Sequence, residues 1–117
     1  EPLKPPEEII KEIHKDGGVA VACHPADSKS TGRHEGNTYL WDHRKKLVSL
    51  FDAWEVGNRN ELFSHIGEKE LDYIANSDFH GREHLHSWKT VLRAGKTLED
   101  VKKAIKENRD VRLLQYR

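Results

Sequence analysis

Two short segments of the sequence combine residue types that bind metal ions. His24 follows an apolar run and precedes a proline, and Asp78-Phe79-His80 follows a second apolar run. An oxygen and a nitrogen donor separated by one residue suit zinc, manganese or iron better than calcium. Each segment alone is a weak signal, because a histidine at the end of a strand is usually a hydrogen-bonded surface group. The combination predicts a metal site that contains His24, Asp78 and His80.

Both segments lie where a buried strand is expected to end. Residues 19–25 form an apolar run bounded by glycine and proline, and residues 72–77 form a third expected strand. Side chains alternate along a strand, so His24 is expected to share a face with two alanines, and Asp78 and His80 to point the same way about 7 Å apart. By the same alternation Cys23 faces opposite His24, which predicts a core position for the thiol. Functional groups gather at the carboxyl ends of parallel strands.

Helices and strands alternate along the rest of the chain. Thr97 is expected to begin the clearest helix, with Asp100 in its third position as a weak form of capping box. Such alternation predicts an α/β fold with a largely parallel sheet and crossover helices, in a single domain over residues 1–117. Helices are expected from Pro5 to Gly17, over 40–50, over 60–71 and from Thr97 onward. The helix from Thr97 is expected to bury a stripe formed by Leu98, Val101, Ala104 and Ile105. The other expected strands are 51–57, 88–93 and 111–116.

The composition limits the classes of function. The 117 residues suffice for one small domain. Lys plus Arg and Asp plus Glu number 20 each, so the charge balance gives no support to a nucleic-acid partner. No apolar run approaches the roughly 20 residues of a membrane span, which predicts no membrane partner. The single cysteine suits a reducing compartment, and we expect a cytoplasmic protein.

Three segments together resemble the PHP family, the polymerase and histidinol phosphatase superfamily of metal-dependent phosphoesterases. They are GGVAVACHP at 17–25, FDAWEVGN at 51–58 and ANSDFH at 75–80. The resemblance spans roughly residues 9 to 107. It implies that His24 is one metal ligand, that Asp78 and His80 are two more, and that the Glu-x-x-Asn segment of Glu55 and Asn58 lines the same mouth.

The resemblance also implies a fold and a reaction. Members of the family have a distorted (β/α)₇ barrel, a relative of the TIM barrel, and hydrolyse phosphate esters at a multi-metal centre. Asp78 is then a ligand that helps to orient the attacking water, and the substrate is a phosphorylated small molecule. Clustered cations generate a hydroxide nucleophile and neutralise phosphate oxygens. His24 and His80 must be neutral to bind metal, so binding should weaken as the pH falls toward about 6.

The sequence departs from the family pattern in its first part. Family members carry a His-x-His pair on their first strand, and the sole such pair here, His84-Leu85-His86, comes after the last motif. The chain also contains no methionine. We therefore expect a fragment or processed chain, the C-terminal portion of a PHP-type domain, that is inactive without its missing ligands. His84 and His86 themselves are candidates for an adventitious metal site.

Substrate contacts are expected from residues beside the predicted ligands. Lys29 and Arg33 lie on the polar segment after His24, where they could reach a substrate phosphate, although two solvated charges are the simpler interpretation. Asn58 is the second substrate-binding candidate, and a structural hydrogen bond explains it equally well. The alternative function is a non-catalytic PHP-like module that acts in assembly, like the domains attached to polymerases. In either case the open sheet edge needs cover, from the remainder of the barrel or from a second copy of the chain.

Overall fold

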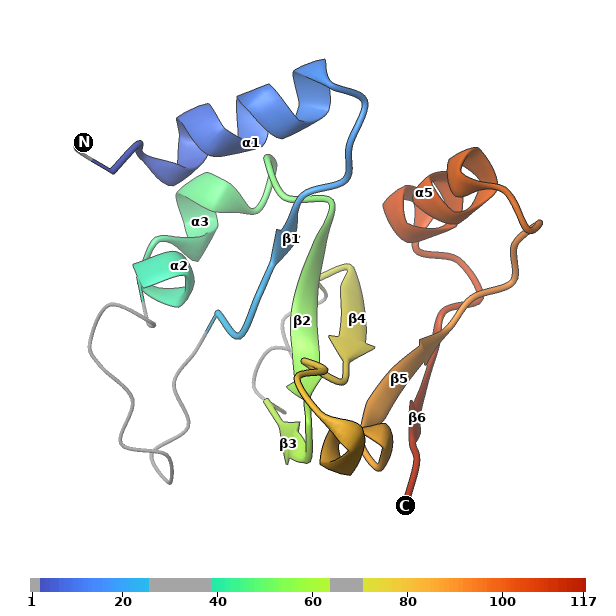
Figure 1. The fold of residues 1–117 in the computed structure, drawn as a ribbon. Helices are drawn as coiled ribbons and strands as arrows, with labels where there is room; N and C mark the ends of the chain where they lie inside the picture. Colours follow the sequence, from blue (N-terminus) through green and yellow to red (C-terminus); the bar gives the residue numbers. More distant parts are fainter. Residues whose placement is uncertain (1–2, 26–38, 64–70) are drawn as a thin grey trace.

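The computed structural model describes residues 3–25, 39–63 and 71–117, which form a mixed α/β fold (Figure 1). The strands of these ranges form two sheets and no closed barrel. No helix of the described residues has the length and apolar character needed to cross a membrane. The elements in chain order are α1 (Pro6–Lys15), β1 (Val21–Ala22), α2 (Tyr39–Asp42), α3 (Arg44–Leu47), β2 (Ala53–Asn58), β3 (Glu61–Leu62), β4 (Tyr73–Asn76), the 3₁₀ helix η2 (Arg82–Leu85), β5 (Trp88–Val91), α5 (Leu98–Glu107) and β6 (Arg112–Gln115).

Strand β2 is the centre of the larger sheet. It pairs in parallel with β1 on one side and with β4 on the other, and β3 returns antiparallel from its end. Every residue of β2 is buried, as expected for a strand covered on both faces. The parallel arrangement predicted for the strands around residues 21, 54 and 74 is therefore observed. It brings the carboxyl ends of β1, β2 and β4 to one edge.

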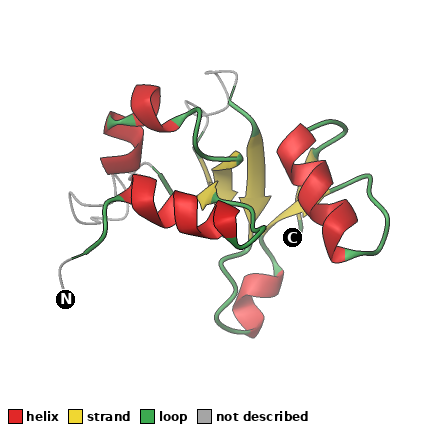
Figure 2. Cartoon of the chain, turned by 90° about the horizontal axis from the view of Figure 1, so that it is seen from above, coloured by secondary structure: helices red, strands yellow, loops and turns green. Residues whose placement is uncertain are grey.

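Helices α1, α2 and α3 lie on one side of the larger sheet (Figures 1 and 2). The main apolar cluster is formed there by buried residues of β1, β2 and α3 together with Phe63, and Trp54 is its largest member. Helix α1 begins with Pro6 at its first turn and ends before Gly17, whose φ of 77° is the left-handed conformation that glycine adopts readily. The carboxylate of Asp52 ties this helix to the sheet, since it lies 2.8 Å from His14 Nε2 and accepts from the backbone N–H of Ala20.

The C-terminal part of the chain differs from the predicted parallel arrangement. Strands β5 and β6 pair antiparallel in a separate two-stranded sheet. Left-handed residues at Asn108 and Asp110 turn the chain between α5 and β6. Asn108 also fixes the end of α5 against β4, because its side chain bonds to the backbone of Tyr73. The small sheet is joined to β4 through Thr90, whose hydroxyl accepts from the N–H of Ala75 at 2.9 Å.

Helix α5 begins where it was predicted but is less buried than expected. Thr97 Oγ1 accepts from the N–H of Asp100 at 3.1 Å, which confirms the N-terminal cap. No residue of α5 is buried, and Leu98 is 72% exposed. The predicted buried stripe is therefore wrong at Leu98, while the other three residues of the stripe are half-buried.

Two of the predicted helices differ from the structure. The helix expected over 40–50 is divided into α2 and α3 at His43. The helix expected over 60–71 is wrong at its start, where the chain forms β3 instead. Arg59 has a left-handed φ of 52°, which suits the tight two-residue turn of a hairpin and sends the chain back along β2. Residues 64–70 of that helix, like the loop expected over 27–38, lie outside the described residues.

Candidate metal centre

The carboxyl ends of β1, β2 and β4 carry most of the predicted site residues. His24 follows β1 after one residue, Asn58 ends β2, and Asp78 follows β4 after one residue. Because β2 pairs with both neighbours, these three ends are adjacent in space. Lys29 and Arg33, the other predicted substrate contacts, lie outside the described residues.

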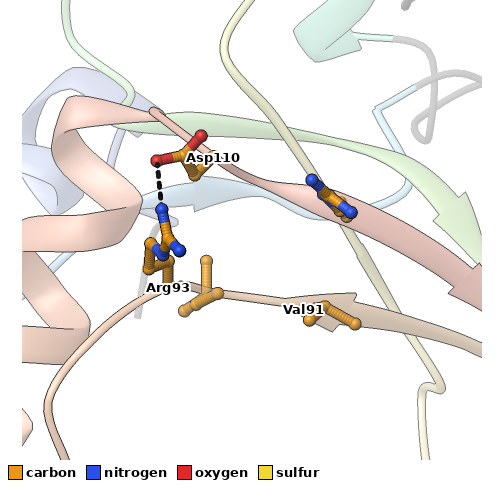
Figure 3. A pocket seen from close by; sticks show the side chains of 5 residues that line it. Val91, Arg93 and Asp110 are labelled. Carbon is orange, nitrogen blue, oxygen red and sulfur yellow. Dashed lines mark ion pairs between the residues drawn. The ribbon is translucent and has the colours of Figure 1, made fainter.

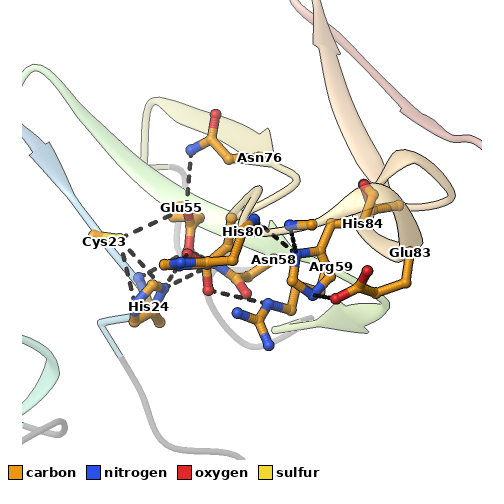
Figure 4. Close-up of polar contacts among 12 residues, drawn as sticks. Cys23, His24, Glu55, Asn58, Arg59, Asn76, His80, Glu83 and His84 are labelled. Atoms are coloured by element: carbon orange, nitrogen blue, oxygen red, sulfur yellow. Dashed lines mark hydrogen bonds and ion pairs between the residues drawn. The ribbon is translucent and has the colours of Figure 1, made fainter.

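The carboxylate of Glu55 is the centre of a hydrogen-bond network at this edge (Figure 4). Its side chain is 1% exposed. Oε1 accepts from the backbone N–H of His24 at 2.9 Å and from Asn58 Nδ2 at 2.8 Å, and Oε2 accepts from Asn76 Nδ2 at 2.8 Å. A buried carboxylate is costly unless hydrogen bonds compensate it, so these donors make the burial of Glu55 possible. The network therefore holds the ends of all three parallel strands together.

A β-bulge places Glu55 and Asn58 on the same side of β2. The register between β2 and β4 shifts between Glu55 and Gly57, so that Val56 is the extra residue on the β2 side. In a regular strand, residues three apart point to opposite faces. The shift reverses this relation, and the Asn58 amide reaches Glu55. The sequence contains no signal for the bulge except Gly57, and strand alternation alone gives the wrong geometry.

His24 is oriented by Glu55. Its Nδ1 lies 2.9 Å from Glu55 Oε1, and its side chain is 27% exposed. When Nδ1 is protonated, its N–H donates a hydrogen bond to the carboxylate, and Nε2 keeps the lone pair that a metal ion needs. Asn58 Nδ2 is also 2.9 Å from His24 Nδ1, but in this tautomer both nitrogens are donors, so the ring is oriented by Glu55 and the Asn58 amide donates to Glu55 instead.

The structure corrects the predicted position of Cys23. The residue is exposed rather than in the core, and its Sγ lies 3.3 Å from His24 Nδ1 and 3.5 Å from His24 Nε2. Regular strand geometry ends at Ala22, and His24 has a left-handed φ of 32°. Strand alternation therefore does not extend to these two residues, and the thiol and the imidazole lie side by side.

Asp78 and His80 form a close pair, although not for the reason predicted. Strand β4 ends at Asn76, and Asp78 has a left-handed φ of 48°, so the two residues do not share the face of a strand. The turn instead brings His80 Nε2 to 3.0 Å from Asp78 Oδ1. The other oxygen, Oδ2, lies 3.2 Å from Nε of Arg59, a residue that the sequence analysis did not single out.

The charges around Asp78 favour its ionised form. Partial burial acts to raise the pKa of this carboxyl, but the hydrogen bond with His80 and the positive charges of Arg59, His24 and His80 together lower the pKa below its ordinary value. An ionised carboxylate is the form that binds a metal.

His84 holds the loop that carries His80. Its Nδ1 accepts hydrogen bonds from the backbone N–H groups of His80 at 2.8 Å and of Gly81 at 3.2 Å. His86 is engaged elsewhere, with its ring 6.0 Å from that of Tyr116. The adventitious site considered for this pair stays a prediction, but one nitrogen of His84 already has backbone partners. A structural role for His84 could not be read from its spacing.

The donor set at this edge fits a divalent transition metal. Cys23, His24 and Glu55 each offer a ligand atom, and the three atoms lie within 4.8 Å of one another. Asp78 and His80 lie outside this group and offer an oxygen and a nitrogen 3.0 Å apart. The sulfur, nitrogen and oxygen donors together suit zinc or iron, and the Asp78–His80 pair also suits manganese. The predicted ligands thus fall into two neighbouring groups.

A shallow pocket near the end of β5 is separate from these groups. It is lined by Val91, Leu92, Arg93, Asp110 and Arg112 (Figure 3). Its ion pair, between Arg93 Nη1 and Asp110 Oδ2 at 4.0 Å, is formed by exposed side chains and adds little stability. None of the predicted ligands lines it, so we assign it no part in the metal chemistry.

In the comparisons with known proteins, no protein-family model matches the sequence and no curated protein matches it.

Proposed function

We propose that this chain is part of a metal-dependent phosphoesterase of the PHP type, with zinc, manganese or iron as cofactor and a phosphorylated small molecule as substrate. The observation that carries the proposal is that His24 and Asp78 follow the two strands that flank β2, and that Glu55 of β2 lies 2.9 Å from His24 Nδ1. These residues come from the three separate segments on which the family resemblance rests.

Each residue of the edge has a distinct role in the proposed reaction. His24 and His80 would hold cations through neutral imidazole nitrogens, and Asp78 would hold one through its carboxylate. Glu55 orients His24 by accepting a hydrogen bond from its Nδ1–H. Bound divalent cations supply Lewis acidity, which activates water and neutralises phosphate oxygens. Asp78 accepts a hydrogen bond from the attacking water and so orients it.

In this proposal Arg59 is a substrate-binding residue in addition to Asn58 and Arg33. Its Nε lies against Asp78, and its side chain is partly exposed at the same edge. Guanidinium groups bind phosphate oxygens through paired N–H donors. The ion pair with Asp78 keeps the guanidinium at the edge, where it would meet the phosphate.

For the finer fold, we propose the C-terminal half of a TIM-like (β/α)₇ barrel. Among the described strands β1 pairs on one side alone, with β2, so its other edge is available for a further parallel strand. The remainder of the barrel would cover this edge and supply further metal ligands. We also retain a cytoplasmic location as part of the proposal.

The test uses the chain extended upstream into the rest of the proposed barrel. We expect the extended protein to contain several metal ions per chain by elemental analysis and to hydrolyse 4-nitrophenyl phosphate, whereas residues 1–117 alone do not. His24→Ala and Asp78→Ala should abolish turnover, and His86→Asn should leave it unchanged as the matched imidazole control. Hydrolysis that survives both alanine changes would show that this edge is not the active site.

A non-catalytic assembly module is the second proposal, and exposed apolar side chains favour it. Leu98, Leu114 and Tyr116 are all at least half exposed on the C-terminal part of the chain. A second copy or another chain would cover them. Light scattering with and without EDTA separates the proposals: assembly predicts a dimer that chelator leaves intact, and a monomer in both conditions contradicts it.

A further inference from the structure

We propose that Cys23, His24 and Glu55 form a thiolate-containing site for one metal ion, and that Zn²⁺ fits it best. The inference rests on the proposed function in that both use His24. It adds Cys23, a ligand that the motif resemblance does not include, and it narrows the metal to one that binds sulfur.

The distances around Cys23 match those between ligands of one zinc ion. Tetrahedral zinc has Zn–S bonds of about 2.3 Å and Zn–N bonds of about 2.0–2.1 Å, which put the sulfur and nitrogen about 3.6 Å apart. Cys23 Sγ lies 3.5 Å from His24 Nε2. It also lies 3.9 Å from Glu55 Oε2, close to the corresponding sulfur–oxygen edge. The sulfur lies at a similar distance, 3.3 Å, from His24 Nδ1. The Cys23 side chain must therefore rotate before its sulfur and the Nε2 lone pair face one ion.

Two of the three ligands are already held in place. Glu55 Oε1 accepts hydrogen bonds from the backbone N–H of His24 and from the side-chain amide of Asn58. The same oxygen lies within hydrogen-bond distance of His24 Nδ1. Oε2 accepts from Asn76 and faces the thiol (Figure 4). The ring and the carboxylate thus lose little freedom on binding.

The chemistry of the thiol selects the metal. A cysteine binds metal as thiolate, so binding releases one proton to solvent and strengthens as the pH rises. Thiolate ligands favour zinc over manganese, which prefers oxygen donors. Asp78 and His80, which provide no sulfur, form the neighbouring pair. The two groups of ligands would therefore prefer different metal ions. The group that contains Cys23 would prefer zinc, and the Asp78–His80 pair would prefer a harder ion.

The test is a Co²⁺ titration of the 117-residue chain followed by absorption spectroscopy. Cys23 is the sole cysteine, so a sulfur-to-cobalt charge-transfer band in the near ultraviolet reports this residue alone. We expect the band to saturate at one Co²⁺ per chain, to disappear when Zn²⁺ is added and to be absent in Cys23→Ser. Glu55→Gln should weaken Co²⁺ binding by roughly 10- to 100-fold. Manganese should not remove the band.

Control variants distinguish this inference from the proposed function. Asp78→Asn and His86→Asn should keep the band, while His24→Asn should remove it. A missing band in the native chain overturns the thiolate site but leaves hydrolysis by the extended protein untouched. The inference is also overturned if the band persists in urea or in His24→Asn, because a thiol outside a folded site then binds the ion. Saturation at half a Co²⁺ per chain, with the ion shared between two thiolates, contradicts it too.

Discussion

The parallel sheet and the C-terminal β5–α5–β6 region differ in how their apolar residues are covered. Every residue of β2 is buried, and the Trp54 cluster packs between this strand and helix α3. In α5 no residue is buried, and β6 alternates between exposed and half-buried positions. Both regions contain amphipathic elements, but only the first is enclosed by the described chain.

This difference separates the part that positions the site from the part that needs a partner. Glu55 can be buried and fully hydrogen-bonded because β1 and β4 enclose β2. The exposed side chains of Leu98, Leu114 and Tyr116 indicate a surface that another element or chain would cover. We therefore expect substitutions in the first region to affect stability and site geometry, and substitutions in the second to affect association.

The largest expected effect is at the centre of the enclosed region. Trp54→Ala should lower the free energy of unfolding by about 3–5 kcal/mol, because it removes a large, fully buried aromatic side chain and leaves a cavity. Leu98→Ala on α5 should change it by less than about 0.5 kcal/mol, as for most exposed positions. Urea unfolding followed by circular dichroism measures both. Equal losses would contradict the contrast between the regions.

A milder variant controls for the shape of the tryptophan. Trp54 Nε1 is buried and has no hydrogen-bond partner in the described structure. Trp54→Phe keeps an aromatic ring and removes this unsatisfied donor, which offsets part of the lost volume. Its loss of stability should therefore be much smaller than that of Trp54→Ala.

The second prediction concerns the network that joins the three strand ends. Glu55→Ala leaves the buried amide of Asn58 without its acceptor, which should cost about 1–3 kcal/mol. Glu55→Gln keeps one acceptor oxygen and should cost less. Urea unfolding gives the two values, and amide exchange of the His24 N–H should accelerate in both variants. An unchanged exchange rate would show that Glu55 does not hold the end of β1.

The third prediction tests the cap of the less covered region. Thr97→Ala removes the acceptor for the N–H of Asp100 and should destabilise the protein by about 1 kcal/mol. Thr97→Ser keeps the hydroxyl and is the matched control. Thermal unfolding measures both variants. A larger loss than that of Glu55→Ala would mean that α5 is better anchored than its exposure indicates.

The smallest expected effect is the pH dependence from Asp78. Its lowered pKa means that the folded protein binds fewer protons here than the unfolded chain. The resulting stabilisation is complete above the ordinary value of about 3.9 and is lost as the pH falls through the lowered pKa. Urea unfolding at pH 6 and at pH 3 gives the free energy of unfolding of the native protein and of Asp78→Asn. The native protein should be the more stable of the two at pH 6, and this difference should shrink at pH 3. A constant difference would exclude this contribution.

Much of the secondary structure could be predicted, because local patterns determine it. Helix α1 follows from Pro6 and the glycines after it, and α5 begins at Thr97 as its cap requires. The strands around Trp54 and Ile74 were recognised from apolar runs between turn residues. The β3 hairpin was missed, because a left-handed Arg59 is not among the common turn signals.

The candidate site was only partly accessible to the same reasoning. His24 and Asp78 were found from residue type and from their place after strands. Strand alternation then misplaced Cys23 and gave the wrong reason for the Asp78–His80 pair, because left-handed backbone at His24 and Asp78 ends the alternation. The support by Glu55, Arg59 and His84 depends on contacts between different elements. No local pattern encodes such contacts.

By itself, the sequence determined where most of the principal helices and strands lie and that a mixed α/β fold would form, and it indicated His24, Asp78 and His80 as candidate metal ligands. These properties depend on residue type and short-range periodicity. Only the tertiary structure decided which donors meet, because a bulge in β2 and left-handed residues after β1 and β4 set the directions of the side chains. It also decided that β5 and β6 pair antiparallel and that α5 stays uncovered, since pairing and burial depend on how distant segments pack.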